Sequence, residues 1–186
     1  MMKFFISYSL FFIGISGFSQ SQILIAYYSK DGSTQKMAEA VATGVLEEDG
    51  IEIILLPVDQ VTQEILKKSE AIILGSPVYN ANVAPEVSAF IASWPFEGEP
   101  LKNKIGAAFV SGGGISGGEE LVQINILQSM LIFGMIIVGG PDSLQPFGAS
   151  AITFEQNLEM DIFLEKGKKL GKRVAEITKR FNVIRE

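Results

Sequence analysis

The sequence predicts an α/β fold in which a five-stranded parallel sheet is covered by helices on both faces. Short apolar runs alternate along the chain with segments whose apolar residues repeat at helical spacing. Such alternation is typical of parallel strands joined by crossover helices. The runs are also continuously apolar, as expected of strands that are buried on both faces.

Five apolar runs are expected to form the strands, at residues 23–28, 51–56, 71–75, 105–110 and 135–138. Pro57 is expected to stop the second strand and the pair Ser76-Pro77 to break the third, because proline cannot donate a main-chain hydrogen bond. Residues 139–157 form the longest irregular stretch, and long loops tend to carry function.

Five helices are expected between and after these strands. Pro85 is tolerated in the first turn of its helix, where its missing N–H costs nothing. In the last helix, a buried stripe is marked by Ile162, Leu170 and Val174. The first helix is expected to follow Thr34 and to end before Gly50. The other four are expected at about 63–68, at 84–92, at 119–133 and at about 158–181.

Composition excludes several kinds of chemistry. The 186 residues include no histidine and no cysteine, so there is no Ser-His-Asp triad, thiolate nucleophile, disulfide or His/Cys metal site. We therefore predict no catalytic side chain and no metal, and expect a bound cofactor to supply the reactive group. A net charge of -6 argues against nucleic acid or an anionic membrane surface as a partner.

Residues 1–19 have the pattern of a signal peptide, which leaves residues 20–186 as one domain. Lys3 precedes an uncharged, mostly apolar run at 4–18, and the small residues Gly17 and Ser19 suit cleavage before Gln20. The run is short for a membrane span, which needs about 20 residues. We expect a periplasmic or extracellular protein with no stable span after cleavage. The alternatives are an N-terminal strand or an uncleaved anchor, and a cytoplasmic protein if the segment is no signal.

The loop after the first strand is a candidate phosphate site. It leads into a helix N-terminus, where free N–H groups and the helix dipole favour an anion. Its hydroxyls suit a phosphate monoester without magnesium, and it lacks the Gly-Lys-Ser/Thr of a Walker A loop. The alternative is an ordinary helix cap. The candidate residues are Ser29, Lys30, Asp31, Gly32, Ser33 and Thr34.

The loop after the third strand is a candidate ring-binding segment. Tyr79 offers a flat face, Pro77 stiffens the turn, and the amides of the two asparagines can hydrogen-bond a ligand. The alternative is a polar turn with a partly exposed tyrosine. The candidate residues are Pro77, Val78, Tyr79, Asn80 and Asn82.

The loop after the fourth strand is rich in glycine. Its Gly-x-Gly-x-x-Gly match is not a dinucleotide fingerprint, because that fingerprint follows the first strand of its unit. Glycines here let the main chain lie against a planar ligand. Ordering so many glycines costs conformational entropy, which indicates that a bound ligand or a packing contact offsets this cost. The alternative is a flexible loop. The candidate residues are Ser111, Gly112, Gly113, Gly114, Gly117 and Gly118.

These loops, with the motifs at 25–34, 75–82, 111–120 and 134–139, resemble the flavodoxin-like superfamily over nearly the whole domain. The nearest branch is the WrbA-type NAD(P)H:quinone oxidoreductases. The resemblance implies a flavodoxin-like three-layer sandwich with strand order 2-1-3-4-5. That order would bring the first and third strands together at a switch point, where ligands bind.

The resemblance also implies roles. Residues 29–34 would hold the phosphate of FMN, residues 78–80 would line the isoalloxazine, and residues 111–118 would wrap its pyrimidine edge. The reaction implied is two-electron reduction of a quinone by NAD(P)H, in a possible homo-oligomer. The branch usually has arginine at Tyr79 and histidine at Phe133, so aromatic residues replace both polar groups near the flavin.

Two alternatives stay open beside the reductase. One is a one-electron carrier of flavodoxin type, which would be a partner-binding protein. The other is an exported flavodoxin-like binding domain without flavin. The ring-binding loops carry no clustered carboxylates before Glu119-Glu120, which favours the reductase over the carrier.

Overall fold

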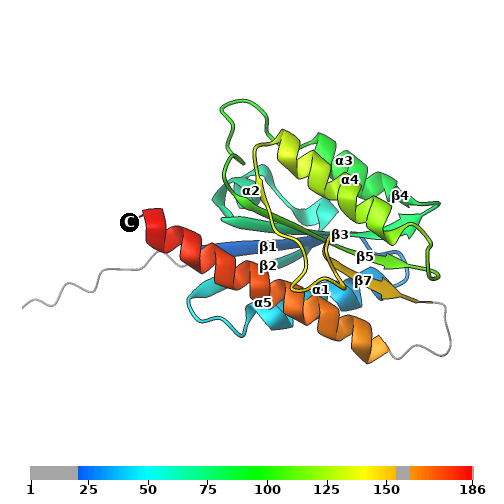
Figure 1. Ribbon diagram of the computed structural model, residues 1–186. Helices are drawn as coiled ribbons and strands as arrows, with labels where there is room; N and C mark the ends of the chain where they lie inside the picture. The colour runs from blue at the N-terminus through cyan, green and yellow to red at the C-terminus, as the bar shows by residue number, and fades with distance from the viewer. Residues whose placement is uncertain (1–20, 154–159, 186) are drawn as a thin grey trace, which may run out of the picture.

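The computed structural model describes residues 21–153 and 160–185, which form a sheet between two layers of helices (Figure 1). The strands are β1 (Ser21–Tyr27), β2 (Ile51–Pro57), β3 (Ala71–Tyr79), β4 (Asn82–Val83), β5 (Ile105–Gly112), β6 (Ile136–Ile137) and β7 (Ala149–Ile152). The helices are α1 (Ser33–Val45), α2 (Gln63–Lys68), α3 (Pro85–Ala92), α4 (Glu119–Ile132) and α5 (Met160–Arg185), with a 3-10 turn at Val58–Gln60.

The predicted strand order is confirmed. The sheet runs β2-β1-β3-β5-β6, and all pairs along this path are parallel. When the short hairpin strand β4 is left out, this order is 2-1-3-4-5 along the chain. The connections from β1 and β3 therefore leave in opposite directions, which makes their carboxyl ends a switch point.

Two apolar cores lie on the two faces of the sheet. Ile23 and Ile25 of β1 belong to the core under α1 and α5, whereas Leu24 and Ala26 belong to the core under α2, α3 and α4. All four side chains are fully buried. The continuous apolar run at β1 is thus explained by burial on both faces, as the sequence predicts.

The fifth strand position differs from the prediction. Residues 135–138 supply only the two-residue strand β6, and β7 continues the same edge beside the second half of β5. The intervening loop folds tightly, since a Cβ on Gly139 or Gly140 would lie 2.2 or 1.9 Å from the carbonyl oxygens of Pro146 or Gln145. The stretch at 139–157 is therefore not wholly irregular.

The third strand also differs, because β3 continues through Ser76-Pro77 to Tyr79. The Gly75 carbonyl oxygen accepts a bond from the Tyr28 N–H on the β1 side, just after β1 ends at Tyr27. Pro77, two residues further, faces the same side, where no strand remains. Its missing N–H therefore breaks no ladder bond, and proline is tolerated.

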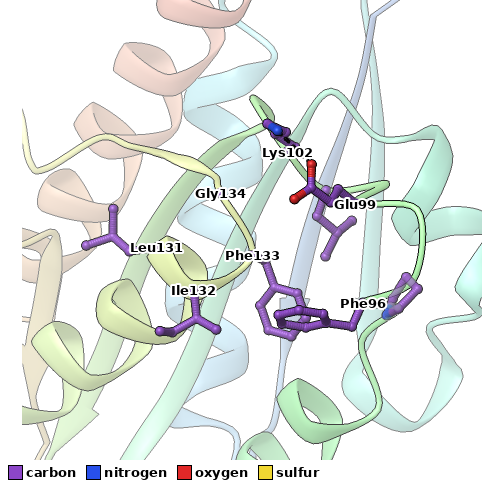
Figure 2. Close-up of a pocket in the computed structure, with 9 residues that line it drawn as sticks. Phe96, Glu99, Lys102, Leu131, Ile132, Phe133 and Gly134 are labelled. Carbon is purple, nitrogen blue, oxygen red and sulfur yellow. Dashed lines mark hydrogen bonds and ion pairs between the residues drawn. The ribbon is translucent and has the colours of Figure 1, made fainter.

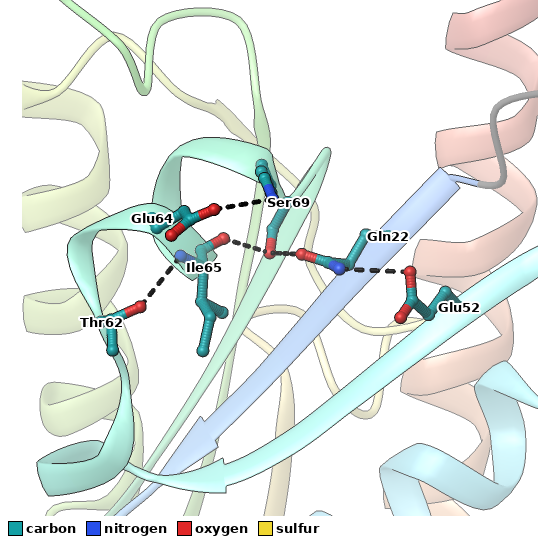
Figure 3. A network of polar contacts seen from close by, with 7 residues as sticks. Gln22, Glu52, Thr62, Glu64, Ile65 and Ser69 are labelled. Carbon is teal, nitrogen blue, oxygen red and sulfur yellow. Dashed lines mark hydrogen bonds and ion pairs between the residues drawn. The ribbon is translucent and has the colours of Figure 1, made fainter.

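A polar network ties α2 to the amino ends of β1 and β2 (Figure 3). The Gln22 amide donates to Glu52 Oε2 at 3.2 Å, and the Ser69 hydroxyl lies 3.2 Å from Gln22 Oε1. Ser69 Oγ also donates to the Ile65 carbonyl oxygen at 2.8 Å, and Thr62 caps the helix by accepting from the Ile65 N–H. This network lies at the amino edge of the sheet, away from the predicted loops.

Acid is expected to weaken the attachment of α5 to the end of α1. Glu47 Oε1 and Oε2 lie 2.7 and 3.0 Å from the ammonium groups of Lys168 and Lys172. Hydrogen bonds from Lys168 first, and then from Lys172, hold the pKa of Glu47 below its ordinary value of 4.5. A lowered pKa in the folded state stabilises the fold above the unfolded pKa, and this stabilisation is lost as pH falls through the folded pKa.

We therefore expect Glu47→Gln to lower the urea midpoint at pH 7 and to have a smaller effect at pH 3. Circular dichroism at both pH values measures this. An equal difference at the two pH values would show that the charge of Glu47 is not the cause.

The predicted signal peptide, residues 1–19, lies outside the described residues, as does the predicted start of the last helix before Met160. Within residues 21–153 and 160–185, no helix has both the length and the apolar character needed to cross a membrane.

Candidate functional site

The three predicted loops meet at one edge of the sheet. They follow β1, β3 and β5, which are neighbours and parallel, so their carboxyl ends lie side by side (Figure 1). Ligands bind at this edge in open α/β sheets. The structure thus brings together the three groups of residues that the sequence singles out.

The first loop is shaped around Gly32, which is the N-cap of α1 and has a φ of 90°. Its N–H donates to Ser29 Oγ at 3.1 Å, and the Ser33 N–H donates to Asp31 Oδ1 at 3.0 Å. Helix α1 has no acidic residue in its first turn, so its free N–H groups and its dipole favour an anion. The Asp31 carboxylate takes one of these N–H groups, and a bound phosphate would compete with it. Lys30 is exposed.

A pair of buried hydroxyls joins the first loop to the third. Thr34 Oγ1 lies 2.7 Å from Ser111 Oγ, and the two side chains are 1% and 5% exposed. Each hydroxyl can donate or accept, so the pair can turn toward a ligand without leaving a buried polar atom unpaired. The first loop and the end of β5 are therefore held in a fixed relation.

The second loop is a tight hairpin between β3 and β4. Asn80 and Ala81 have φ values of 52° and 59°, as the two central residues of a type I′ turn require. The Asn82 side-chain amide donates to the Asn80 carbonyl oxygen at 2.7 Å, so it serves the turn. Ser76 fixes the base of the hairpin, because its Oγ accepts the Ala84 N–H at 3.0 Å. Ser76 and Ala81 belong to the loop predicted after the third strand, but the sequence assigned neither a role; alanine rarely adopts positive φ.

Two tyrosines and a glutamate form a hydrogen-bonded cluster beside this hairpin. Glu86 hydrogen-bonds the Tyr28 hydroxyl, and this bond, followed by burial, raises the pKa of Tyr28 above 10.0. Burial first, and then the charges of Glu86 and Asp31, raise the pKa of Tyr79, whose hydroxyl is bonded to that of Tyr28. Both phenols therefore stay protonated near neutral pH. Tyr28 and Glu86 were not predicted, because no motif marks them; only their places after β1 and in the first turn of α3 do.

The third loop needs its glycines for different reasons. A Cβ on Gly118 would lie 2.5 Å from the Cβ of Ala81, so the N-cap of α4 touches the hairpin. A Cβ on Gly112 would lie 2.8 Å from Glu119 Oε1, and one on Gly117 would lie 2.9 Å from the Gly114 carbonyl oxygen. Gly114 itself has open space around it. The loop is therefore closely packed against its surroundings at Gly112, Gly117 and Gly118.

These residues fit a flavin mononucleotide. The helix N-terminus with the hydroxyls of Ser29, Ser33 and Thr34 suits a phosphate monoester. The main chain at 111–118 has no side chain that would block a planar ring at Gly113 or Gly114, and Tyr79 offers an aromatic face. No group of three or more His, Cys, Asp or Glu side chains among the described residues could hold a metal ion.

A separate small pocket lies at the opposite edge of the sheet (Figure 2). It has a volume of ≈ 130 Å³ and is lined by Phe96, Phe133 and the ion pair of Lys102 with Glu99, among others. Phe133 follows the end of α4, and its ring packs 5.4 Å from that of Phe96. Within one chain, α4 therefore places Phe133 roughly 20 Å from the glycine loop, because its 14 residues rise about 1.5 Å each.

Comparison with known proteins agrees with this fold. A family model described as NADPH-dependent FMN reductase matches residues 58–148. A flavodoxin from Clostridium saccharobutylicum is 35% identical over 120 residues, which cover 64% of this chain and 73% of that protein. An NAD(P)H dehydrogenase (quinone) from Sinorhizobium fredii is 30% identical over 195 residues, covering 84% of this chain and 96% of the relative.

Solved structures share the fold. An archaeal flavodoxin superposes with a TM-score of 0.70 at 26% identity and covers 85% of this chain and 99% of its own. A WrbA-like protein from Agrobacterium tumefaciens gives a TM-score of 0.72 at 23% identity, with 86% and 98% covered. The chain belongs to the flavodoxin-like superfamily, near the branch that contains the NAD(P)H dehydrogenases (quinone). The predicted family is confirmed.

Proposed function

We propose that this chain is an FMN-dependent oxidoreductase that passes two electrons from NAD(P)H to a quinone. The observation that carries the proposal is the joining of three loops into one site. The hydroxyl pair of Thr34 and Ser111 links the phosphate loop to the glycine loop, and Gly118 packs on the hairpin at Ala81. The names of the related NAD(P)H dehydrogenases (quinone) support the choice of donor and acceptor.

The roles of the residues follow from their geometry. The α1 N-terminus and the hydroxyls of Ser29, Ser33 and Thr34 would bind the phosphate. Main-chain N–H groups at 111–118 would hold the pyrimidine edge, and Tyr79 would line one face of the ring. Bound FMN supplies hydride chemistry, which this chain's side chains cannot perform. Burial, followed by the nearby charge of Glu86, raises the pKa of Tyr79, so its hydroxyl stays protonated beside that face.

We also propose that the domain is exported and that it self-associates. Cleavage before Gln20 would release the domain outside the cytoplasm, and FMN would then be bound after transport. Ile115 and Leu121, beside the glycine loop, are 65% and 61% exposed, which supports contact with a second copy or another apolar partner.

Titration of the chain from Gln20 with FMN tests the proposal. We expect one FMN per chain, with quenching of the flavin fluorescence, followed by oxidation of NADH or NADPH only when a quinone is present. Size-exclusion chromatography with light scattering gives the oligomeric state. A folded chain that leaves FMN free would overturn the proposal and favour the domain without flavin.

A second candidate is a one-electron carrier, which the related flavodoxins favour. Acidic residues near the ring, such as Glu86 and Asp31 beside Tyr79, are consistent with it. A carrier would bind FMN but would not oxidise NAD(P)H at a useful rate. A redox titration in two separate one-electron steps, without turnover of NAD(P)H, would select this candidate.

A further inference from the structure

The carboxyl group of Glu119 is buried against the glycine loop. Glu119 is the first residue of α4 and is only 7% exposed. Its Oε1 has no hydrogen-bond partner among the residues that the structure describes. A Cβ at Gly112 would lie only 2.8 Å from this atom, and a Cβ at Gly117 would be in van der Waals contact with it at 3.6 Å. The carboxyl oxygen is therefore aimed into the loop.

An unpaired buried polar atom requires an explanation, because it costs free energy unless something offsets it. The N-terminus of α4 offsets part of this cost, since its dipole favours a negative charge in the first turn. The charged neighbours in the adjoining hollow are Glu120, on the same turn, and Lys166, from α5. No ion pair joins Lys166 to Glu119 among the described residues, and its ammonium group instead lies 5.3 Å from the centre of the Phe163 ring.

We propose that the carboxylate of Glu119 favours the oxidised form of the flavin bound in the glycine loop. This inference rests on the proposed function. Hydride transfer from NAD(P)H leaves NAD(P)⁺ and brings two electrons and one proton to the flavin, which thereby gains one negative charge. A fixed carboxylate in a poorly solvated site repels that charge more strongly than a solvent-exposed one does. Reduced FMN is therefore held less tightly than oxidised FMN, and it passes its electrons on more readily.

The substitution Glu119→Gln tests this, because it removes the charge and keeps the shape. Glu120→Gln is the matched control, since it makes the same charge change one residue away on an exposed side chain. The dissociation constant of oxidised FMN is measured by fluorescence quenching, and the midpoint potential by spectroelectrochemical titration. We expect Glu119→Gln to tighten reduced FMN about tenfold relative to oxidised FMN, a rise of about 30 mV for two electrons. Glu120→Gln should give a smaller change that added salt removes.

Several outcomes overturn the inference. It is wrong if Glu119→Gln leaves the midpoint potential unchanged, or if Glu120→Gln shifts it equally. It is also wrong if both oxidation states are weakened by the same factor, which would indicate a purely structural role. Glu119→Asp keeps the charge and should retain the wild-type potential, so a rise in Glu119→Asp equal to that in Glu119→Gln would also overturn the inference. A wild-type chain that binds no FMN would overturn the proposed function and this inference with it.

Discussion

Replacing Gly171 with valine is expected to unfold much of the protein. A Cβ at Gly171 would lie 1.9 Å from the Val41 carbonyl oxygen and 3.1 Å from the Val45 main-chain nitrogen. The contact is reciprocal, because a Cβ at Gly44 would lie 1.8 Å from the Lys168 carbonyl oxygen. Helices α1 and α5 thus touch main chain to main chain, and no rotamer change can make room.

The expected loss is at least about 3 kcal/mol, since overpacking a close contact typically costs 1–3 kcal/mol and here main chain must move. That is a large part of the roughly 5–15 kcal/mol that stabilises a domain. Urea unfolding followed by circular dichroism, together with the soluble yield, measures it.

Gly167→Ala on the same helix is the control. Its Cβ would lie 3.3 Å from the Ala40 Cβ and from the Met37 carbonyl oxygen, so small shifts suffice. Alanine also favours helix over glycine by about 1 kcal/mol. We expect a near-neutral change. If Gly171→Val unfolds at the wild-type urea concentration, α1 and α5 do not pack through their glycines.

The close contact between α1 and α5 could not be predicted from the sequence. The apolar repeat at Met37, Ala38, Val41 and Val45 predicts α1, and its buried face is confirmed. Within a helix pattern, however, Gly44 and Gly171 look only like weak helix formers. Their purpose depends on which two helices meet, which is a property of the tertiary structure. Periodicity finds the elements, but it does not find their closest approach.

The site divides in a similar way. The loops at 29–34 and 111–118 could be predicted from the sequence, because glycines and hydroxyl residues that directly follow apolar strands indicate turns and helix caps. No role in the site could be predicted for Tyr28, Ser76 or Glu86, because each acts through a partner that lies elsewhere along the chain. The edge strand β7 was not predicted either, because a strand of four residues that pairs on one side has little hydrophobic pattern of its own.

Replacing Gly32 with valine is expected to weaken FMN binding about 100-fold, or about 2.7 kcal/mol. Gly32 has a φ of 90°, which a β-branched residue adopts only with strain. A Cβ there would meet no atom within 4 Å, so the substitution changes the loop conformation and creates no clash. Relaxation of the loop would move the Gly32 N–H away from Ser29 Oγ and turn the first N–H groups of α1 off the phosphate. Fluorescence quenching measures the affinity.

Two controls separate an effect on the proposed phosphate site from a general loss of stability. Gly50→Val imposes a similar strain, because Gly50 has a φ of 81° and open space, but it precedes β2 at the other edge of the sheet. It should lower stability comparably, by about 1–2 kcal/mol, and leave FMN affinity unchanged. Riboflavin, which lacks the phosphate, should bind the wild type and Gly32→Val equally. An equal loss for riboflavin and FMN would place the effect of Gly32 at the ring rather than at the phosphate, and the loop at 29–34 would lose its assigned role.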